Sequence, residues 1–361
     1  MSKEARILFV TVYLLLGLGV VMTYSSSAMY AEYLYRNSLY FLIRQISFAA
    51  IGTLLMFAVF AVAPRFWKEH SRAMMFMAIV FLLLVFVPVV GHSAGGARRW
   101  IWLGVMNFQP VEFAKVAVCV YLSDYLARKR KSIHRGSLGV FFPPLLLLGI
   151  VCALTLLQPD LGSTVFIFLL ASILFFLAGI HLRYVIAALA IMLPVFTLLI
   201  IKFPYRLSRV TAFLNPWDDP QGSGFQIIQS LYAFALGGFK GVGLGESTQK
   251  LFYLPSSYND FIFSIIGEEL GLLGIAGVMG LYITIFVCGI LMAEKASTDY
   301  EKFLIISLTL LIVLQAVIHM MVATGLVPTK GLPLPFVSYG GTSLVFNLIA
   351  VGLLLGITRK S

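Results

Sequence analysis

The feature that most constrains this chain is a succession of long apolar runs, separated by short loops that carry most of its charge. Of its 361 residues, 60% are hydrophobic and only 11% are charged, a composition outside the range of soluble domains. About 20 consecutive apolar residues are enough for a helix to cross the hydrocarbon of a bilayer. We therefore predict an all-α polytopic membrane protein, with residues 1–361 forming a single integral membrane domain.

Ten apolar runs are predicted to form transmembrane helices. The first run is longer than the apolar core of a secretory signal, so we interpret it as a retained helix. The predicted helices cover residues 7–26, 39–62, 72–90, 108–127, 138–157, 161–179, 184–201, 261–292, 303–325 and 341–357.

The long segment between the seventh and eighth helices, residues 202–260, is not predicted to be a linker. Its apolar residues recur at helical spacing around 222–236, which indicates an amphipathic helix lying on the membrane surface. A connection of this length in a compact protein is usually functional.

The basic residues of the short loops predict the orientation. With a cytoplasmic N-terminus, the inner segments carry 15 Lys and Arg residues, including the cluster from Arg128 to Arg135, and the short outer loops carry four. Because basic residues accumulate on the cytoplasmic side, both termini are predicted inside and residues 202–260 outside. This topology also explains the net charge of +11 without a nucleic-acid partner, which would require a clustered basic face.

The cysteines and histidines indicate neither a disulfide framework nor a metal centre. Cys119, Cys152 and Cys288 all lie inside apolar runs, and the five histidines show no ligand spacing. We therefore predict no structural metal site.

Several charged residues are predicted to lie at one level near the outer ends of the helices. Charge inside a membrane is costly and is by default a functional hypothesis. The residues at this level are Arg44, Glu112, Lys115, Asp160 and Asp260. Only Glu268 and Glu269 lie deeper in the eighth helix, and the sequence assigns them no role.

Each of these charges also has a structural interpretation. Glu112 and Lys115 are three residues apart on one helix face, so they can pair and neutralise each other. Pro110 and Pro159 suit the first turn of a helix, which places Glu112 and Asp160 at helix starts. Asp260 stands just before an apolar run, where Asp is a preferred N-cap.

Two glycine-rich segments lie among the outer loops. Residues 237–245 lack the glycine spacing of a nucleotide-binding loop, so plain turns or flexible backbone near a headgroup remain as interpretations. Residues 328–341 enter the last helix from outside. Non-helical backbone there must line a polar cavity or be buried in protein.

In these motifs the chain resembles the shape, elongation, division and sporulation (SEDS) family, the ten-helix polymerases of bacterial peptidoglycan. The resemblance spans almost the whole chain and is strongest to the division and sporulation branch. It rests on ARRWI at 97–101, QPVEFAK at 109–115, QPDLGS at 158–163, NPW at 215–217, GFQ at 224–226, QS at 229–230, GVGLG at 241–245, STQK at 247–250, DFIF at 260–263, PTKGLP at 328–333 and PLPFVSYGG at 333–341.

The resemblance implies glycosyl transfer between lipid II-type molecules on the outer face of the bacterial cytoplasmic membrane. Asp260 would be the general base that activates the attacking hydroxyl. The substrate-binding residues would be Arg44, Arg98, Arg99, Glu112, Lys115, Asp160, Lys330 and Ser338, whose cations balance the leaving pyrophosphate. The implied partners are the nascent glycan strand and a class B penicillin-binding protein, a transpeptidase.

No cofactor is certain from the resemblance. A divalent cation, Mg or Mn, would help the leaving group, although the sequence contains no dedicated cage of carboxylates. The chain departs from the family just before Asp260. The family usually has Pro-Glu-Ala/Pro-His-Thr-Asp-Phe where residues 255–261 read PSSYNDF. The acidic residue is kept and its neighbours are replaced.

Two other functions fit the same topology. A lipid II flippase would share substrate and fold, but a transport path needs charges through the midplane rather than at one outer level. A non-catalytic scaffold for division proteins would gain nothing from the intramembrane Glu112, Lys115 and Asp160.

The charge distribution predicts that a cysteine placed near Arg130 is protected from an impermeant thiol reagent in intact cells, whereas one in residues 202–260 is labelled. The measurement is external labelling of single engineered cysteines. Strong labelling near Arg130 would show that the orientation is inverted.

Overall fold

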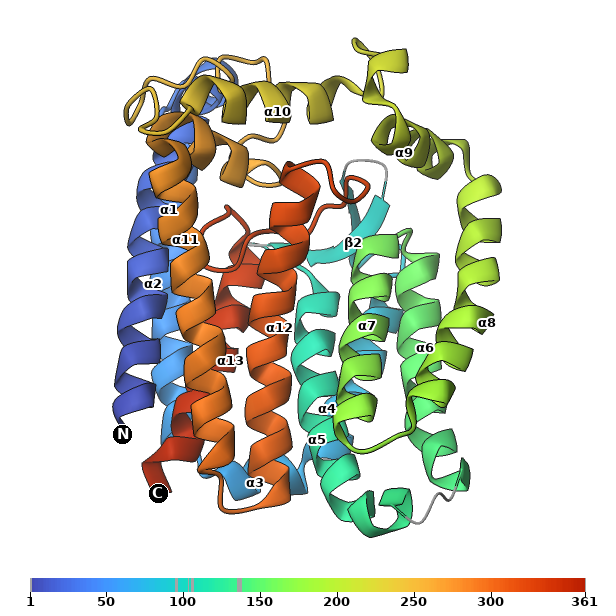
Figure 1. The fold of residues 1–361 in the computed structure, drawn as a ribbon. Helices are drawn as coiled ribbons and strands as arrows, with labels where there is room; N and C mark the ends of the chain where they lie inside the picture. The colour runs from blue at the N-terminus through green and yellow to red at the C-terminus, as the bar shows by residue number, and fades with distance from the viewer. Residues whose placement is uncertain (1, 95–96, 103, 105–106, 135–137, 361) are drawn as a thin grey trace.

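Long helices stand side by side in the computed structural model, and both termini lie at the same end of the bundle (Figure 1). The structure describes residues 2–94, 97–102, 104, 107–134 and 138–360. The bundle is formed by α1 (Lys3–Tyr35), α2 (Tyr40–Ala61), α4 (Ser71–Leu84), α5 (Pro110–His134), α6 (Phe142–Leu157), α7 (Leu161–Leu177), α8 (Leu182–Ile201), α11 (Ile262–Glu294), α12 (Asp299–Ala323) and α13 (Gly341–Ile357). The connecting elements are α3 (Pro64–Glu69), α9 (Pro204–Leu214), α10 (Phe225–Gly237) and the 3-10 turns η1 (Leu138–Phe141), η2 (Pro216–Asp218) and η3 (Thr358–Lys360).

The predicted all-α, polytopic architecture is confirmed. Each of the ten predicted runs coincides with one of the long helices, and the amphipathic segment predicted at 222–236 is α10. Within the described residues, five helices are long and apolar enough to cross a membrane: α1, α2, α11, α12 and the continuous helix Gly139–Leu157. That all ten runs cross the bilayer stays a prediction.

Local sequence explains where the helix ends differ from the prediction. α12 begins at Asp299 rather than 303, because Thr298 and Glu301 form a capping box at its start. α4 ends at Leu84 rather than 90. Pro88 follows soon afterwards, and a proline disfavours helical backbone in the residue before it.

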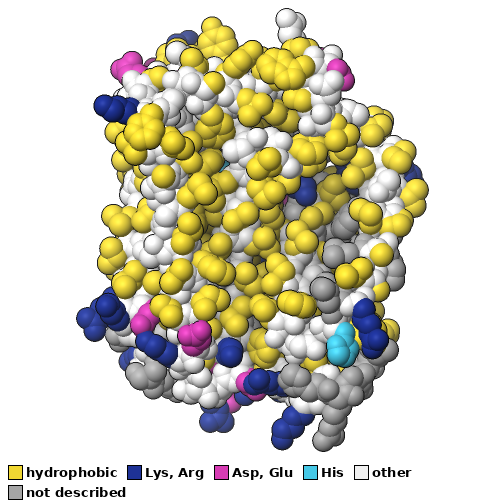
Figure 2. Space-filling model, viewed as in Figure 1, with side chains coloured by type: hydrophobic (Ala, Val, Ile, Leu, Met, Phe, Trp, Pro, Cys, Tyr) yellow, Lys and Arg dark blue, Asp and Glu magenta, His cyan; other side chains and the backbone are white. Residues whose placement is uncertain are grey.

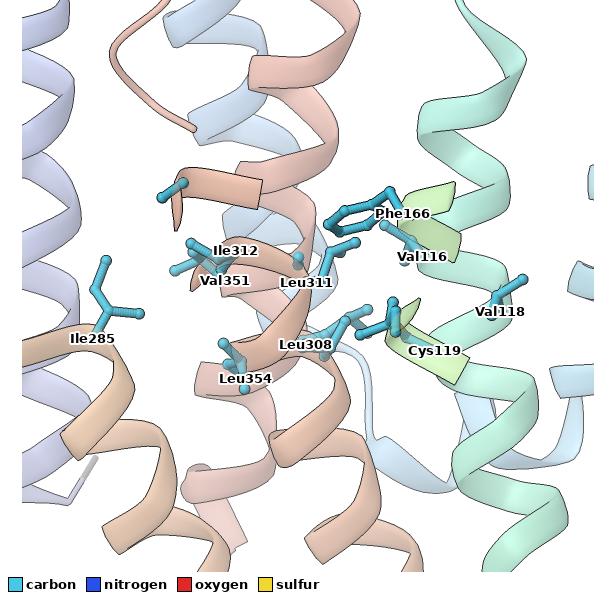
Figure 3. Packing of buried hydrophobic residues seen from close by; sticks show 14 of the residues in the cluster. Val116, Val118, Cys119, Phe166, Ile285, Leu308, Leu311, Ile312, Val351 and Leu354 are labelled. Carbon is cyan, nitrogen blue, oxygen red and sulfur yellow. The ribbon is translucent and has the colours of Figure 1, made fainter. Parts of the chain in front are cut away.

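Apolar packing places α12 at the centre of the bundle. Figure 3 shows Leu308 and Leu311 of α12 beside Cys119 and Val116 of α5, and Phe166 of α7 lies against the same group. On its other side α12 packs against α11 and α13. Van der Waals packing of these side chains stabilises the helix arrangement.

Small residues allow the closest helix contacts. A Cβ atom built on Gly352 of α13 would lie 2.5 Å from the carbonyl oxygen of Met56 in α2. A Cβ on Gly19 of α1 would lie 2.4 Å from the carbonyl oxygen of Phe336, in the segment before α13. Glycine is therefore required where two backbones approach this closely.

A small antiparallel sheet lies at the end of the bundle opposite the termini (Figure 1). It consists of β1 (Gly91–Ala94), β2 (Ala97–Trp102) and β3 (Asn107–Phe108), in that order. The all-α prediction did not include this sheet, because its strands are too short to produce a recognisable alternation. Its importance is that β2 carries Arg99 to the candidate site described below.

The long segment between α8 and α11 covers the same end of the molecule, with α9 and α10 running across it (Figure 1). After α10, the glycine-rich run packs on α11 through backbone hydrogen bonds. Val242 N and Gly243 N donate to the carbonyls of Glu268 and Glu269, at 2.9 and 3.0 Å. Gly271 interrupts α11 there with a φ of 63°, and a Cβ on Gly241 would lie 2.2 Å from the Glu269 carbonyl oxygen. The run is thus a turn segment that needs glycine for close backbone approach.

Surface chemistry separates the two ends of the bundle. Figure 2 shows a broad hydrophobic band on the face turned to the viewer, with many basic side chains at the end that holds both termini. Arg128 and Arg130 of the predicted cytoplasmic cluster belong to the C-terminal part of α5. Arg135 lies outside the described residues.

Candidate active site

A cavity of about 570 Å³ lies at the end of the bundle that carries the sheet and α9. Five separate parts of the chain meet in it. They are β2, the turn before α7, the α8–α9 region, Asp260 in the loop before α11, and the segment after α12. Its ionisable lining residues are Arg99, Asp160, Arg206, Arg209, Asp260 and Lys330.

Asp260 is half-buried and faces this cavity, two residues before α11 begins. It is not the N-cap, because Phe261 occupies that position and makes no side-chain capping hydrogen bond. A Cβ built on Gly331 would lie 3.7 Å from both carboxylate oxygens of Asp260, so the segment after α12 passes directly beside the acid.

Burial raises the pKa of Asp260 to about 6, while the positive charges of Arg209 and Arg99 act in the opposite direction. A carboxylate with a pKa near 6 is ionised at neutral pH yet is a stronger base than an ordinary aspartate. This is the range in which a general base works efficiently.

Backbone contacts fix the loop that presents Asp260. The Ser256 carbonyl accepts hydrogen bonds from Asn259 N at 3.1 Å and from Asp260 N at 3.0 Å. Tyr339 N donates to the carbonyl of Tyr258 at 3.1 Å, and Ser338 Oγ donates to the carbonyl of Asn259 at 2.8 Å. The loop is therefore attached to the segment before α13.

The cavity is electropositive, since four cations face two carboxylates. Arg209 Nη1 donates to the carbonyl of Thr329 at 3.2 Å, and Arg99 Nε donates to the carbonyl of Gln158 at 3.2 Å. Burial lowers the pKa of Lys330. Nη1 of Arg206 is buried and has no hydrogen-bond partner in the described part of the chain. This arrangement suits a ligand with several negative charges.

Asp160 lines the cavity but also caps α7. Its carboxylate accepts hydrogen bonds from Ser163 N at 3.1 Å and from Ser163 Oγ at 2.8 Å. Capping therefore occupies both carboxylate oxygens of Asp160, as its position at a helix start allowed.

Glu112 and Lys115 form the ion pair that their spacing allowed, with 2.8 Å between Oε2 and Nζ, and both side chains are buried. The pair does not line the cavity. Lys115 Nζ also donates to Gln315 Oε1 at 2.9 Å, and Gln315 Nε2 donates to the carbonyl of Pro333 at 2.8 Å. The pair thus connects to the segment that carries Lys330.

Three further candidates lie outside the cavity. Arg44 is exposed, with its guanidinium 4.6 Å from the centre of the Tyr40 ring. Arg98 is exposed on β2, next to Arg99. Ser338 is buried and holds the Asp260 loop through its bond to Asn259. The structure therefore brings Arg99, Asp160, Asp260 and Lys330 together in the cavity, whereas Arg44, Arg98, Glu112, Lys115 and Ser338 do not line it.

The deeper pair, Glu268 and Glu269, anchors the outer segment. Glu268 accepts hydrogen bonds from Ser247 Oγ and, at 2.8 Å each, from Thr248 N and Thr248 Oγ1. Glu269 accepts from Ser25 Oγ at 2.6 Å and pairs with Lys250 Nζ at 2.9 Å. These buried carboxylates hold residues 247–250 against α1 and α11.

Sequence reasoning missed Arg206 and Arg209. Both belong to the long outer segment, whose basic residues carry little information on topology and were discounted for that reason. One signal was present, because Pro204 suits a helix start and the two arginines are three residues apart, on one face of α9.

Comparison with known proteins places this geometry in a family. A family model described as "Cell cycle protein", representing FtsW, RodA and SpoVE, matches residues 5–361. The probable peptidoglycan glycosyltransferase FtsW of Geobacter sulfurreducens (strain ATCC 51573 / DSM 12127 / PCA) is 42% identical over 342 residues, which are 95% of this chain and 91% of that protein. The stage V sporulation protein E of Bacillus subtilis (strain 168) is 40% identical over 366 residues, 100% of this chain and 98% of that protein.

Solved structures share the fold over nearly the full length. A chain from the work described as "Structural coordination of polymerization and crosslinking by a peptidoglycan synthase complex" has a TM-score of 0.80 and 30% identity, covering 98% of this chain and 97% of that chain. The rod shape determining protein RodA of Thermus thermophilus has a TM-score of 0.71 and 25% identity, covering 98% and 96%.

The buried ion pair generates a stability prediction. Replacing Lys115 by Met leaves Glu112 as an uncompensated buried charge, so Lys115→Met should lower the local stability by about 3–5 kcal/mol. The double variant Glu112→Gln with Lys115→Met should recover part of that loss. The measurement is thermal unfolding in detergent.

The matched control is Arg65→Gln, which breaks the exposed pair Arg65–Glu69 and should leave the unfolding temperature close to that of the parent protein. A Lys115→Met protein that unfolds at the parent temperature would show that the buried pair does not support the fold.

Proposed function

The chain belongs to the family of FtsW, RodA and SpoVE, and from that premise we propose that it is a peptidoglycan glycosyltransferase that polymerises lipid II into glycan strands. It acts as a multi-pass protein of the bacterial cytoplasmic membrane, with both termini in the cytoplasm and the cavity at the outer face. In this proposal residues 1–361 form one integral membrane domain.

The observation that carries this proposal is the environment of Asp260. A carboxylate whose pKa is raised to about 6 stands in a cavity where four cations face two carboxylates. Glycosyl transfer from a lipid-linked sugar needs both features, because it requires a base for the attacking hydroxyl and positive charge for the departing pyrophosphate.

In the proposed reaction the 4-hydroxyl of N-acetylglucosamine on the incoming lipid II attacks. Asp260 accepts its proton as the oxygen forms a bond to the anomeric carbon of N-acetylmuramic acid at the end of the growing chain. The bond from that carbon to the pyrophosphate oxygen breaks, and its electron pair leaves with undecaprenyl pyrophosphate.

The cations around Asp260 would bind the pyrophosphate. Arg99, Arg209 and Lys330 line the cavity together with Arg206, whose buried Nη1 is without a protein partner among the described residues. Donors that are already positioned stabilise the negative charge as it develops on the leaving oxygen. Arg44 and Arg98 are exposed and do not line the cavity, and they would steer an anionic substrate towards it.

The residues present do not form a cage for a divalent cation. No group of three or more His, Cys, Asp or Glu side chains that suits a metal exists in the described part of the chain. Of the two carboxylates in the cavity, Asp160 already accepts two hydrogen bonds from Ser163. The proposed mechanism therefore includes no step through Mg or Mn.

A class B penicillin-binding protein is the proposed partner. Its transpeptidase activity would cross-link the strands that this chain produces, and the similarity to a chain of a peptidoglycan synthase complex supports such an assembly.

A lipid II flippase is the alternative with the same substrate. The cavity favours the enzyme, because its charged residues gather at one end of the bundle around a single tuned carboxylate. Formation of glycan polymer by the purified chain separates the two functions, since a flippase forms no polymer.

The catalytic assignment predicts that Asp260→Asn folds normally but polymerises lipid II about 10² to 10⁴ times more slowly, because an amide cannot accept the proton. The measurement is polymer length and yield on a gel at matched protein concentration and melting temperature. The control is Asp218→Asn, which neutralises an exposed carboxylate of the same outer segment and should leave the rate unchanged. Near-parental polymer from Asp260→Asn would remove Asp260 from the role of base.

The raised pKa of Asp260 predicts the pH dependence. The base must be ionised, so kcat/KM should be level above about pH 6 and fall about tenfold per unit below it. Initial rates between pH 4.5 and 8 measure this fall of kcat/KM on the acidic side. The fall should be absent from the residual activity of Asp260→Asn. A midpoint near pH 4, the ordinary range of an aspartate, would contradict the effect of burial.

A further inference from the structure

Two hollows lie side by side at the end of the bundle that carries the termini, far from Asp260 in the fold. The first, about 600 Å³, lies between α4, α5, α6 and η1. The second, about 520 Å³, lies between α3, α4 and α5. Arg72 and Arg128 line both hollows, so the two hollows adjoin at these side chains, and together they are called the recess.

The recess carries positive charge that the described residues do not neutralise with ion pairs. Two of its cations have partners, in the pairs Arg65–Glu69 and Arg128–Asp124. The remaining cations are Lys68, Arg72 and Lys129, and none of them forms an ion pair within the described residues. Three unpaired cations around one recess indicate an anionic ligand.

The wall of the first hollow is apolar. It is formed by Met75, Phe76 and Ile79 of α4 and by Pro143 and Leu147 of α6. From Arg72 to Ile79 the wall extends about 10 Å along α4 at 1.5 Å per residue, most of the roughly 15 Å of one leaflet. The recess therefore combines a charged end with an apolar wall of leaflet depth.

The hollow opens on the surface that faces lipid. Phe76, which lines it, is 70% exposed, and Leu145 and Leu146 on the adjoining turn of α6 are 50% and 52% exposed. In a membrane-spanning bundle such side chains contact acyl chains. A ligand can thus enter from the bilayer itself, with its apolar part along α4 and α6.

We propose that this recess is a binding site for an anionic phospholipid of the cytoplasmic leaflet, with the headgroup phosphate at Arg72, Lys129 and Arg128 and an acyl chain in the apolar hollow. Charge complementarity and the lipid-facing opening select this ligand, since basic pockets between helices at the cytoplasmic side bind anionic headgroups. The site is separate from the proposed active site and does not depend on its chemistry.

A lipid bound there would join three helices. Tyr125 of α5, which lines the hollow, already donates a hydrogen bond to the carbonyl of Val140 in η1. A phospholipid held between α4, α5 and α6 would add contacts to all three, so its binding should raise the unfolding temperature of the full chain by mass action.

The test compares lipids that share acyl chains, dioleoyl phosphatidylglycerol and dioleoyl phosphatidylcholine, titrated onto the delipidated full chain in detergent. Binding is followed by native mass spectrometry and by unfolding temperature. Phosphatidylglycerol should bind at least tenfold more tightly. Each of Arg72→Gln and Lys129→Gln should weaken its binding about fivefold, the contribution of about 1 kcal/mol per basic residue at a membrane surface.

The control is Lys131→Gln with Lys302→Gln, which removes the same charge as the double variant from exposed positions outside the recess. It should change binding less than twofold, while Arg72→Gln with Lys129→Gln loses about 25-fold. All four side chains are exposed, so the substitutions should leave the fold intact.

Three results would overturn the proposal. Equal binding of the two lipids would show that the negative charge of the headgroup does not contribute to binding. Equal losses in the double variant and in its control would assign the effect to general surface electrostatics. If inorganic phosphate raised the unfolding temperature at the concentration effective for phosphatidylglycerol, the recess would be a small-anion site in which the acyl chain has no role.

Discussion

The segment between α12 and α13 depends on polar side chains from neighbouring helices, because unpaired backbone groups inside a membrane bundle cost several kcal/mol each. Gln315 Nε2 donates to the carbonyl of Pro333, and His319 Nδ1 donates to the carbonyl of Leu332 at 2.8 Å. Lys115 occupies the amide oxygen of Gln315, which leaves the amide nitrogen directed at the segment. A buried ion pair that does not line the cavity thereby supports the segment whose backbone passes beside Asp260.

Buried polar side chains also hold the outer segment, and here they are carboxylates. Glu268 and Glu269 are fully buried on α11, and each is satisfied by hydroxyl groups, backbone N–H groups or Lys250. Removing charge from water is tolerated when every oxygen has a partner. Two non-helical segments at this end of the molecule are therefore anchored by buried polar side chains, and one of them carries Lys330 into the cavity.

The helices could be predicted because apolar periodicity and length are local properties, and the ten runs coincide with helices. The predicted helices also placed the charged residues near the helix ends, but the roles of these residues depend on tertiary contacts. Spacing predicted that Glu112 and Lys115 pair, but nothing local indicates that the pair contacts Gln315, 200 positions away. Arg206 and Arg209 reach the cavity only because α9 folds back over the bundle, which no pattern within the outer segment specifies.

The loop that presents Asp260 is held by its backbone, not by the side chains that differ from the family motif. The carbonyls of Ser256, Tyr258 and Asn259 make the bonds that hold this loop, so the backbone defines the turn whichever side chains it carries. The φ of 57° at Ser256 is left-handed, where Ser is strained relative to Gly, and the three N–H groups that its carbonyl accepts offset that strain. Tuning of the acid by Glu, His or Thr neighbours is then unnecessary, because burial alone raises its pKa against the opposing arginines.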